Sequence, residues 1–210
     1  MMQNQTNPNM QTGQVSGQMN HGGHEVFDVH EMLSGSVSTM NLYLLMREHV
    51  KDPELRNMMD RQYQFIQEEY NLTCECFRTG QKPSKRTESY MMKQDNDFIY
   101  GIKPSQPKKP WQSPAEISDE FIAGLMLNCA KSAASMKTIA ALESTNPVVR
   151  RVIAASVPNC IEMAYEISLY MNKHQYYQVP QLSQQDMQQM TNMYAPSQGQ
   201  PQMAGAGSAL

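Results

Sequence analysis

An internal repeat constrains the fold of this chain more strongly than any other feature. The sequence KDPELR at 51–56 aligns with TNPVVR at 145–150, 94 positions later. Further positions align at the same offset: Leu42, Leu45, Met59, Ile66 and Glu68 with Met136, Ile139, Ile153, Cys160 and Glu162. Because this period exceeds the roughly 20–50 residues of solenoid repeats, we expect a closed bundle of two related helical hairpins.

The first copy is predicted to form a helical hairpin over residues 27–80. Apolar side chains recur at helical spacing from about Val29 to Val50, and Asp28 with Glu31 offers a capping box before them. A second helix is expected to follow a short turn.

This second helix should begin at Pro53, because a proline at the first helical position loses no hydrogen bond and Asp52 can cap the helix. Gly80 is expected to end it. Met58 and Met59 lie on its apolar stripe, where methionine packs adaptably in a core.

The second copy predicts another hairpin over residues 114–180. Its first helix is expected to begin at Ser118, and its second at the Asn146–Pro147 pair that repeats Asp52–Pro53. This last helix is expected to end near His174.

Residues 81–113 form a long connection with seven basic and three acidic residues. Loops longer than about 15 residues are uncommon in compact domains, so the length needs a structural reason. A crossover along the bundle supplies one, because it lets the second and third helices run parallel. The sequence thus predicts an all-α, ferritin-like four-helix bundle over residues 25–180.

Both ends of the chain are predicted to be disordered. Residues 1–24 contain no Asp, Glu, Lys or Arg, and residues 181–210 are rich in Gln and Met with Asp186 as the sole charge. A short helix around 186–193 is compatible with the second segment. Polar, glutamine-rich segments favour self-association or partner binding.

Composition excludes several functional classes. The net charge is -3, which gives no reason to expect a nucleic-acid partner. No run of 18 apolar residues occurs, so we expect no membrane insertion, and the first residues lack the pattern of a secretory signal. These features predict synthesis in the cytoplasm.

Three stretches in the second half resemble the Coat F family of bacterial endospore coat proteins. They are SDE at 118–120, Glu143-x-x-Asn146-Pro147-x-x-Arg150, and KHQYY at 173–177 followed by Pro180. About 60 residues match closely, and the hairpin at 27–80 is similar to a degenerate first half. The tails are outside the resemblance.

The resemblance implies a ferritin-like bundle made in the cytoplasm of the mother cell and assembled into the spore coat. It further implies a structural, non-enzymatic protein whose partners are other spore coat proteins, and it leaves a homo-oligomer open. The resemblance also suggests that the crossover, where Tyr90, Tyr100 and Trp111 are interleaved among lysines, presents its Lys and Tyr side chains for coat crosslinking.

A ferritin-like bundle raises the question of a di-metal centre, which needs Glu-x-x-His on two helices. Glu68, Glu69, Glu162 and Glu166 lie on the right helices, but none has a histidine three residues later. We therefore expect no metal ligands, no cofactor and no catalytic residues. The alternative is a ferritin-like metal-binding or redox protein with non-standard ligands.

The equivalent carboxylates of the two halves, Glu68 and Glu162, could in principle do acid–base work as a buried pair. Buried charges are rare, so the favoured interpretation is a solvated helix face or an ion pair with Arg56 or Arg150. These arginines are expected to tie each turn to the last carbonyls of the preceding helix.

The four cysteines do not form a zinc motif. Cys74 and Cys76 are two residues apart, which places them on different helix faces, and no second pair follows at zinc spacing. Cys129 and Cys160 should lie at the same height in the second hairpin, where two buried thiols are favoured over a disulfide. In an oxidising coat any of the four could crosslink.

Overall fold

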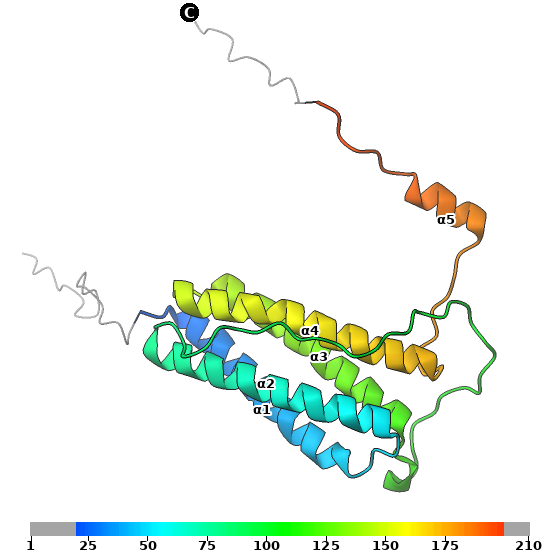
Figure 1. Cartoon of the computed structure of the whole chain (residues 1–210), viewed down its shortest axis with the longest axis horizontal. Helices are drawn as coiled ribbons and strands as arrows, with labels where there is room; N and C mark the ends of the chain where they lie inside the picture. The colour runs from blue at the N-terminus through cyan, green and yellow to red at the C-terminus, as the bar shows by residue number, and fades with distance from the viewer. Residues whose placement is uncertain (1–19, 200–210) are drawn as a thin grey trace, which may run out of the picture.

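The computed structural model describes residues 20–199, and four long helices dominate this part of the chain (Figure 1). Their bounds are α1 Gly23–Arg47, α2 Pro53–Thr79, α3 Asp119–Glu143 and α4 Pro147–Lys173. A 3₁₀ turn, η2 (Pro114–Glu116), precedes α3, and the short helix α5 (Gln184–Thr191) follows the bundle. The predicted all-α class is confirmed.

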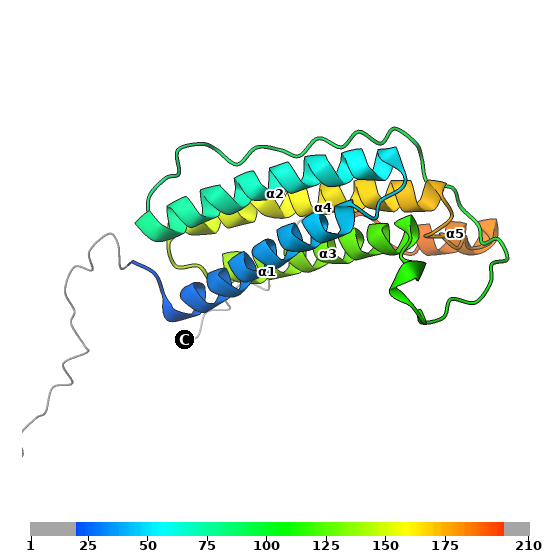
Figure 2. The ribbon, with the colours of Figure 1, turned by 90° about the horizontal axis from the view of Figure 1, so that it is seen from below.

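The four long helices form a bundle of two hairpins. Within the bundle α1 packs beside α2 and α3, while α4 packs beside α3 and α2. The long segment between α2 and α3 runs back along the bundle. It is a crossover that joins the α1–α2 hairpin to the α3–α4 hairpin, as in ferritin-like proteins (Figures 1 and 2). The predicted topology is therefore confirmed.

The two halves keep the repeat seen in the sequence. Helices α2 and α4 are both 27 residues long, and both begin at the aligned prolines Pro53 and Pro147. Asp52 caps α2 by accepting a hydrogen bond from the backbone of Glu54, and Asn146 caps α4 in the same way. Gly80 ends α2 in the left-handed conformation, as predicted.

The predicted bounds of α1 were wrong at both ends. The helix begins at Gly23 instead of Val29, and its cap residue, Gly22, offers no side-chain hydrogen bond. It ends at Arg47, after which the chain turns and inserts Val50 into the core with 1% of its surface exposed. Long-range packing at each end therefore outweighs local capping signals.

The predicted terminal segments lie largely outside the described residues, since 1–19 and 200–210 are not described. Of the remainder, residues 23–24 belong to α1, which corrects the boundary predicted at 24. Residues 184–191 form α5, close to the short helix considered for 186–193.

The core is rich in methionine, as the apolar stripes predicted. The methionines of α1 and α2 that were expected to be core residues are all buried: Met32, Met40, Met58 and Met59. A larger cluster occupies the end of the bundle near the turn between α1 and α2, and a smaller one surrounds Val149 and Ile153. Across residues 20–199, no helix combines the length and apolar character that a membrane crossing requires.

The crossover lies on the side of the bundle formed by α2 and α4, away from α1 and α3 (Figure 2). It is held by side chains of α4. The backbone of Tyr90 donates to Asn159 at 2.9 Å, that of Lys93 to Glu166 at 2.8 Å, and that of Ile99 to Asn172 at 2.7 Å. Within residues 20–199, one side of the bundle is thus covered by the crossover and the opposite side by no other segment.

Candidate functional site

A buried charged layer crosses the middle of the bundle. The Lys137 ammonium of α3 donates to Glu69 Oε2 of α2 at 2.6 Å, and Asn159 Nδ2 of α4 donates to Glu69 Oε1 at 2.7 Å. Lys137 is 8% exposed and Glu69 6% exposed. Both oxygens of the Glu69 carboxylate are therefore occupied by donors from two other helices.

A second buried carboxylate lies two turns further along α4. Glu166 is fully buried and accepts hydrogen bonds from the Arg61 guanidinium, the Tyr90 hydroxyl, the Lys93 backbone N–H at 2.8 Å and Gln62 Nε2 at 3.2 Å. Burial, together with the adjacent Glu166 carboxylate, raises the pKa of Tyr90 well above its ordinary value. Tyr90 therefore remains a neutral donor, and Glu166 joins α2, α4 and the crossover.

These groups do not fit a ferritin-type metal centre. Such a site needs carboxylate oxygens that face free space and histidines on inward faces. Here both buried carboxylates are saturated by protein donors, and the Lys137 ammonium already provides a positive charge beside Glu69. Among residues 20–199, no histidine joins Glu69 or Glu166 in a group of potential metal ligands.

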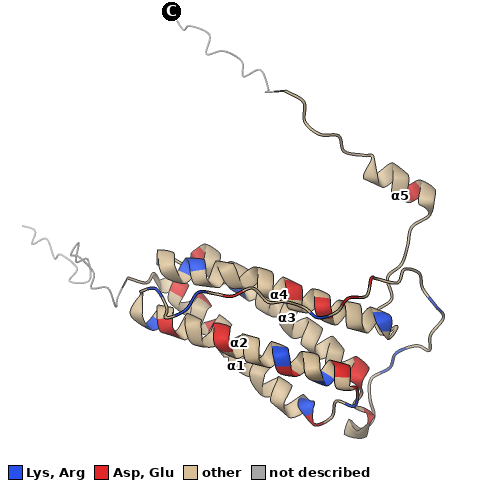
Figure 3. Ribbon diagram, in the orientation of Figure 1, with Lys and Arg blue, Asp and Glu red and all other residues tan. Residues whose placement is uncertain are grey.

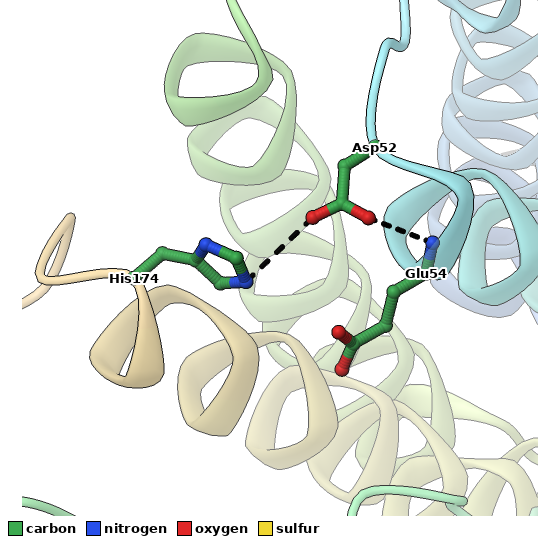
Figure 4. Close-up of side chains that lie close together, drawn as sticks. All are labelled: Asp52, Glu54 and His174. Atoms are coloured by element: carbon green, nitrogen blue, oxygen red, sulfur yellow. Dashed lines mark hydrogen bonds and ion pairs between the residues drawn. The ribbon is translucent and has the colours of Figure 1, made fainter.

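Asp52, Glu54 and His174 form a separate group at the junction of α2 and α4, with ligand atoms within 4.8 Å of one another (Figure 4). Asp52 Oδ1 accepts from the Glu54 backbone at 2.8 Å, and Oδ2 accepts from the Tyr170 hydroxyl at 2.9 Å while lying 3.6 Å from His174 Nε2. Lys173 Nζ lies 2.9 Å from Glu54 Oε2. The geometry is that of a helix junction, in which a cation would compete with Lys173.

Two carboxylates, each from one hairpin, accept hydrogen bonds from the turn of the other hairpin, and we call these two contacts the clasps. Glu25, at the start of α1, accepts from the backbones of Thr145 at 2.8 Å and Asn146 at 2.9 Å, in the turn of the other hairpin. Asp119, at the start of α3, accepts from the backbones of Lys51 at 2.9 Å and Asp52 at 3.1 Å. Each half of the molecule therefore orders the turn of the other half.

Glu25 should make stability depend on acidity. Its burial alone would raise its pKa, but hydrogen bonds from Asn146, Thr145 and His21 outweigh burial and hold the pKa below its ordinary 4.5. A lowered pKa means that the stabilisation is complete above that ordinary value and is lost as the pH falls through the folded-state pKa. Glu25→Gln should cost about 2 kcal/mol at neutral pH and less in acid.

Urea unfolding followed by circular dichroism from neutral pH to pH values below the ordinary carboxyl pKa checks this prediction. Glu31→Gln is the matched control, because Glu31 is an exposed carboxylate of the same helix. An equal stability difference at every pH between the Glu25→Gln variant and the unmodified protein would show that the Glu25 carboxylate is not the titrating group.

The carboxylates singled out by the repeat are not the buried ones. Glu68 is exposed and Glu162 half-buried, in line with the solvated helix face that was favoured for them. The Arg56 guanidinium donates to the Val50 carbonyl, which lies in the turn after the end of α1, so Arg56 stabilises the first turn but does not reach the last helical carbonyls as expected. The Arg150 side chain is exposed and makes no hydrogen bond to any residue between 20 and 199, so the equivalent tie is absent from the described chain.

Tyr90 was expected to be available on the crossover, and that prediction is wrong. Its side chain is 6% exposed because it inserts between α2 and α4 and packs edge-on against Phe65, with ring centroids 5.2 Å apart. Tyr100 and Trp111 are 60% and 40% exposed. They remain accessible aromatic side chains of the crossover.

All four cysteines are free thiols. Cys129 and Cys160 line one internal cavity of about 20 Å³, so they lie at the same level of the bundle as expected. Burial raises the pKa of both thiols and raises that of Cys76 to about 11. Since the thiolate is the reactive form, these three side chains are poor nucleophiles at neutral pH in the folded protein.

Comparison with known proteins identifies the family of this chain. The Coat F domain matches residues 118–180, which comprise α3, α4 and the segment that follows them. The chain is 54% identical over 188 residues to the spore coat protein F-like protein YhcQ of Bacillus subtilis (strain 168), an alignment that covers 89% of this chain and 87% of that protein. No solved structure matches the chain. The similarity to YhcQ extends over most of both proteins, and the chain therefore belongs to the Coat F family of spore coat proteins.

Proposed function

We propose that this protein is a non-catalytic structural component of the bacterial endospore coat, made in the mother cell and assembled through contacts with other coat proteins. The relative named as a spore coat protein F-like protein supports the location. The observation that carries the structural role is the interior of the bundle, where a ferritin-like protein would do its chemistry. There Glu69 and Glu166 are saturated by Lys137, Arg61 and their neighbours.

The bundle provides a rigid unit whose parts are mutually dependent. The reciprocal clasps of Glu25 and Asp119 tie the hairpins together, and α4 holds the crossover through Asn159, Glu166 and Asn172. A unit of this kind suits assembly, because its outer surfaces keep fixed positions while its buried carboxylates, Glu69 and Glu166, are held by protein donors.

Localisation tests the proposal. A fluorescent protein fused to the N-terminus of the chain should give a ring around the developing spore during sporulation, with the same fluorescent protein alone as the control. Fluorescence that stays diffuse in the mother cell throughout sporulation would overturn the coat assignment.

Metal analysis of the purified protein tests the alternative of a metal-binding or redox protein. That alternative would depend on Asp52, Glu54 and His174, the group whose ligand atoms approach one another. We expect iron, manganese and zinc well below one ion per chain. One ion per chain that is lost in a His174→Ala variant would favour the alternative over the structural role.

A further inference from the structure

The crossover has an open strand edge, residues 97–103, where it passes the C-terminal end of α4 (Figure 1). Tyr100 forms a parallel bridge with Val179, in the segment that follows the bundle. The Ile99 N–H donates to Asn172 Oδ1 at 2.7 Å. The Gly101 N–H donates to the Val179 carbonyl at 2.9 Å. Neighbouring residues of an extended strand direct their backbone groups to opposite edges, so the N–H and the carbonyl of Tyr100 project from the open edge.

The open edge has the composition and exposure of a strand that can accept another. Within residues 20–199, neither backbone group of Tyr100 has a hydrogen-bond partner. Ile99, Tyr100 and Ile102 are 56%, 60% and 69% exposed, and β-branched and aromatic residues of this kind favour strands. Unpaired backbone groups on an exposed apolar edge are a template for pairing with another chain. The open edge is short, because Gly101 has a φ of 103°, outside the range of a regular strand, and Pro104 cannot donate to a ladder.

The charges at the ends of the open edge indicate what pairs with it. The crossover carries residues of both signs (Figure 3), and Asp97 and Lys103 lie three positions before and three positions after Tyr100. Both side chains are exposed, and neither forms a salt bridge with another described residue. In an antiparallel pair of two such edges centred on Tyr100, each Asp97 lies opposite the Lys103 of the other copy. A parallel pair would place like charges opposite each other, which is destabilising. The open edge is therefore complementary in charge to a second copy of itself.

We infer that two copies of this chain join through their open edges as antiparallel strands centred on Tyr100. Residues directly opposite each other in such a ladder can exchange two backbone hydrogen bonds, and they use the N–H and the carbonyl that the monomer leaves unpaired at Tyr100. The same segment serves both molecules, so the contact is isologous and closes as a dimer. The inference rests on the proposed structural role and deepens it, because it names a contact through which the bundles join.

The contact should be weak and concentration-dependent. A strand of this length spans only about 23 Å. It buries less than the roughly 1,000 Å² of a stable interface. Sedimentation velocity on the full chain, from micromolar to millimolar concentration, should therefore show a reversible equilibrium between monomer and dimer.

Proline at position 100 tests the backbone pairing. Tyr100→Pro removes an N–H that has no partner within the described monomer, so it should leave the fold intact and weaken association about tenfold or more. Edge strands tolerate proline where the N–H faces solvent. Tyr100→Val, the matched control, loses the ring but keeps the N–H and the strand preference, and it should change association by less than about threefold. Circular dichroism and thermal unfolding of both variants check that the bundle is unchanged. Association that survives Tyr100→Pro, or that is lost equally in Tyr100→Val, would overturn the inference.

A charge exchange tests the direction of the strands. Asp97→Lys and Lys103→Asp should each weaken association, because each brings like charges together, and the double variant should restore it. Single variants that associate as tightly as the unmodified chain would mean that the two charged ends do not meet, and they would overturn the antiparallel pairing.

Tyr100→Cys tests the register. Opposed residues of a hydrogen-bonded antiparallel pair have Cα atoms about 5.5 Å apart, within reach of a disulfide. Mild oxidation should therefore give a crosslinked dimer on non-reducing gels for Tyr100→Cys and none for Met91→Cys, since Met91 is a more exposed position of the same crossover, at 78%. Equal crosslinking of both variants would mean random collision and would overturn the register. A chain that stays monomeric at every concentration yet still forms the ring around the spore would overturn the inference alone and leave the proposed function intact.

Discussion

Lys137→Met should lower the free energy of unfolding by about 3–5 kcal/mol, because it leaves the Glu69 carboxylate buried without its cation. Burial alone would lower the pKa of Lys137, but the Glu69 carboxylate outweighs it and the pKa is raised. The ammonium is therefore charged at neutral pH and 8% exposed, with its partner oxygen 2.6 Å away. Methionine matches the aliphatic part of the lysine side chain, so the loss of the charged ammonium is the main change.

Urea unfolding measures this loss, and two further variants define its origin. Lys131→Met makes the same change at an exposed position of α3 and should alter stability by no more than about 0.5 kcal/mol. Lys137→Met combined with Glu69→Met should recover most of the stability, since an apolar pair can replace a buried ion pair at little cost. A loss below about 1 kcal/mol for Lys137→Met alone would mean that water reaches Glu69 in solution.

The helices that were placed correctly from the sequence are those whose ends depend on local signals. Asp52 and Asn146 cap helices that begin with proline, and the structure places both starts where the repeat predicted them. Helix α1 was misplaced because its first turn is fixed by Glu25, which binds a turn about 120 residues away in the sequence. Local capping rules contain no information about such a contact.

One signal for the clasps was nevertheless present in the sequence. Glu25 and Asp119 are separated by the repeat period of 94 positions, as are the turns that they bind. An acidic residue at the same position of both copies, before the first apolar positions of each hairpin, could have been interpreted as a shared contact. Neither residue was predicted to make such a contact.

The buried carboxylates could not be identified from the repeat. Glu68 and Glu69 are neighbours, and a step of one residue rotates a side chain by about 100° around the helix, which separates solvent from core. Packing against Lys137 of α3 decides that Glu69 is the buried one. Glu166 has no equivalent in the first copy, because a single crossover needs a single set of anchors, and symmetry therefore gave no indication of it.

The crossover was predicted from its length, but its anchors depend on which side of the bundle it follows. Asn159 and Glu166 are seven residues apart and lie on one side of α4, where each accepts a backbone N–H of the crossover. Buried polar residues at this spacing on an otherwise apolar helix need partners, and an irregular segment supplies them.

Glu166→Gln should destabilise the protein by about 3 kcal/mol and release the middle of the crossover. The variant keeps the shape of the side chain but removes the charge that Arg61 pairs with, and its amide group cannot accept from both the Tyr90 hydroxyl and the Lys93 backbone. The substitution should therefore destabilise the crossover segment that Glu166 holds, in addition to lowering the global stability of the protein.

Limited proteolysis with trypsin resolves the local effect from the global one. Cleavage after Lys93, whose backbone is bonded to Glu166, should accelerate on the order of tenfold or more in the variant, because proteolysis tracks the population of the open segment. Cleavage after Lys108, in the exposed part of the crossover, is the internal reference and should change little. Glu162→Gln, one turn earlier on α4 and half-buried, should leave both rates unchanged. If cleavage after Lys93 and after Lys108 accelerated by the same factor in the Glu166→Gln variant, Glu166 would act through global stability and would not anchor the crossover.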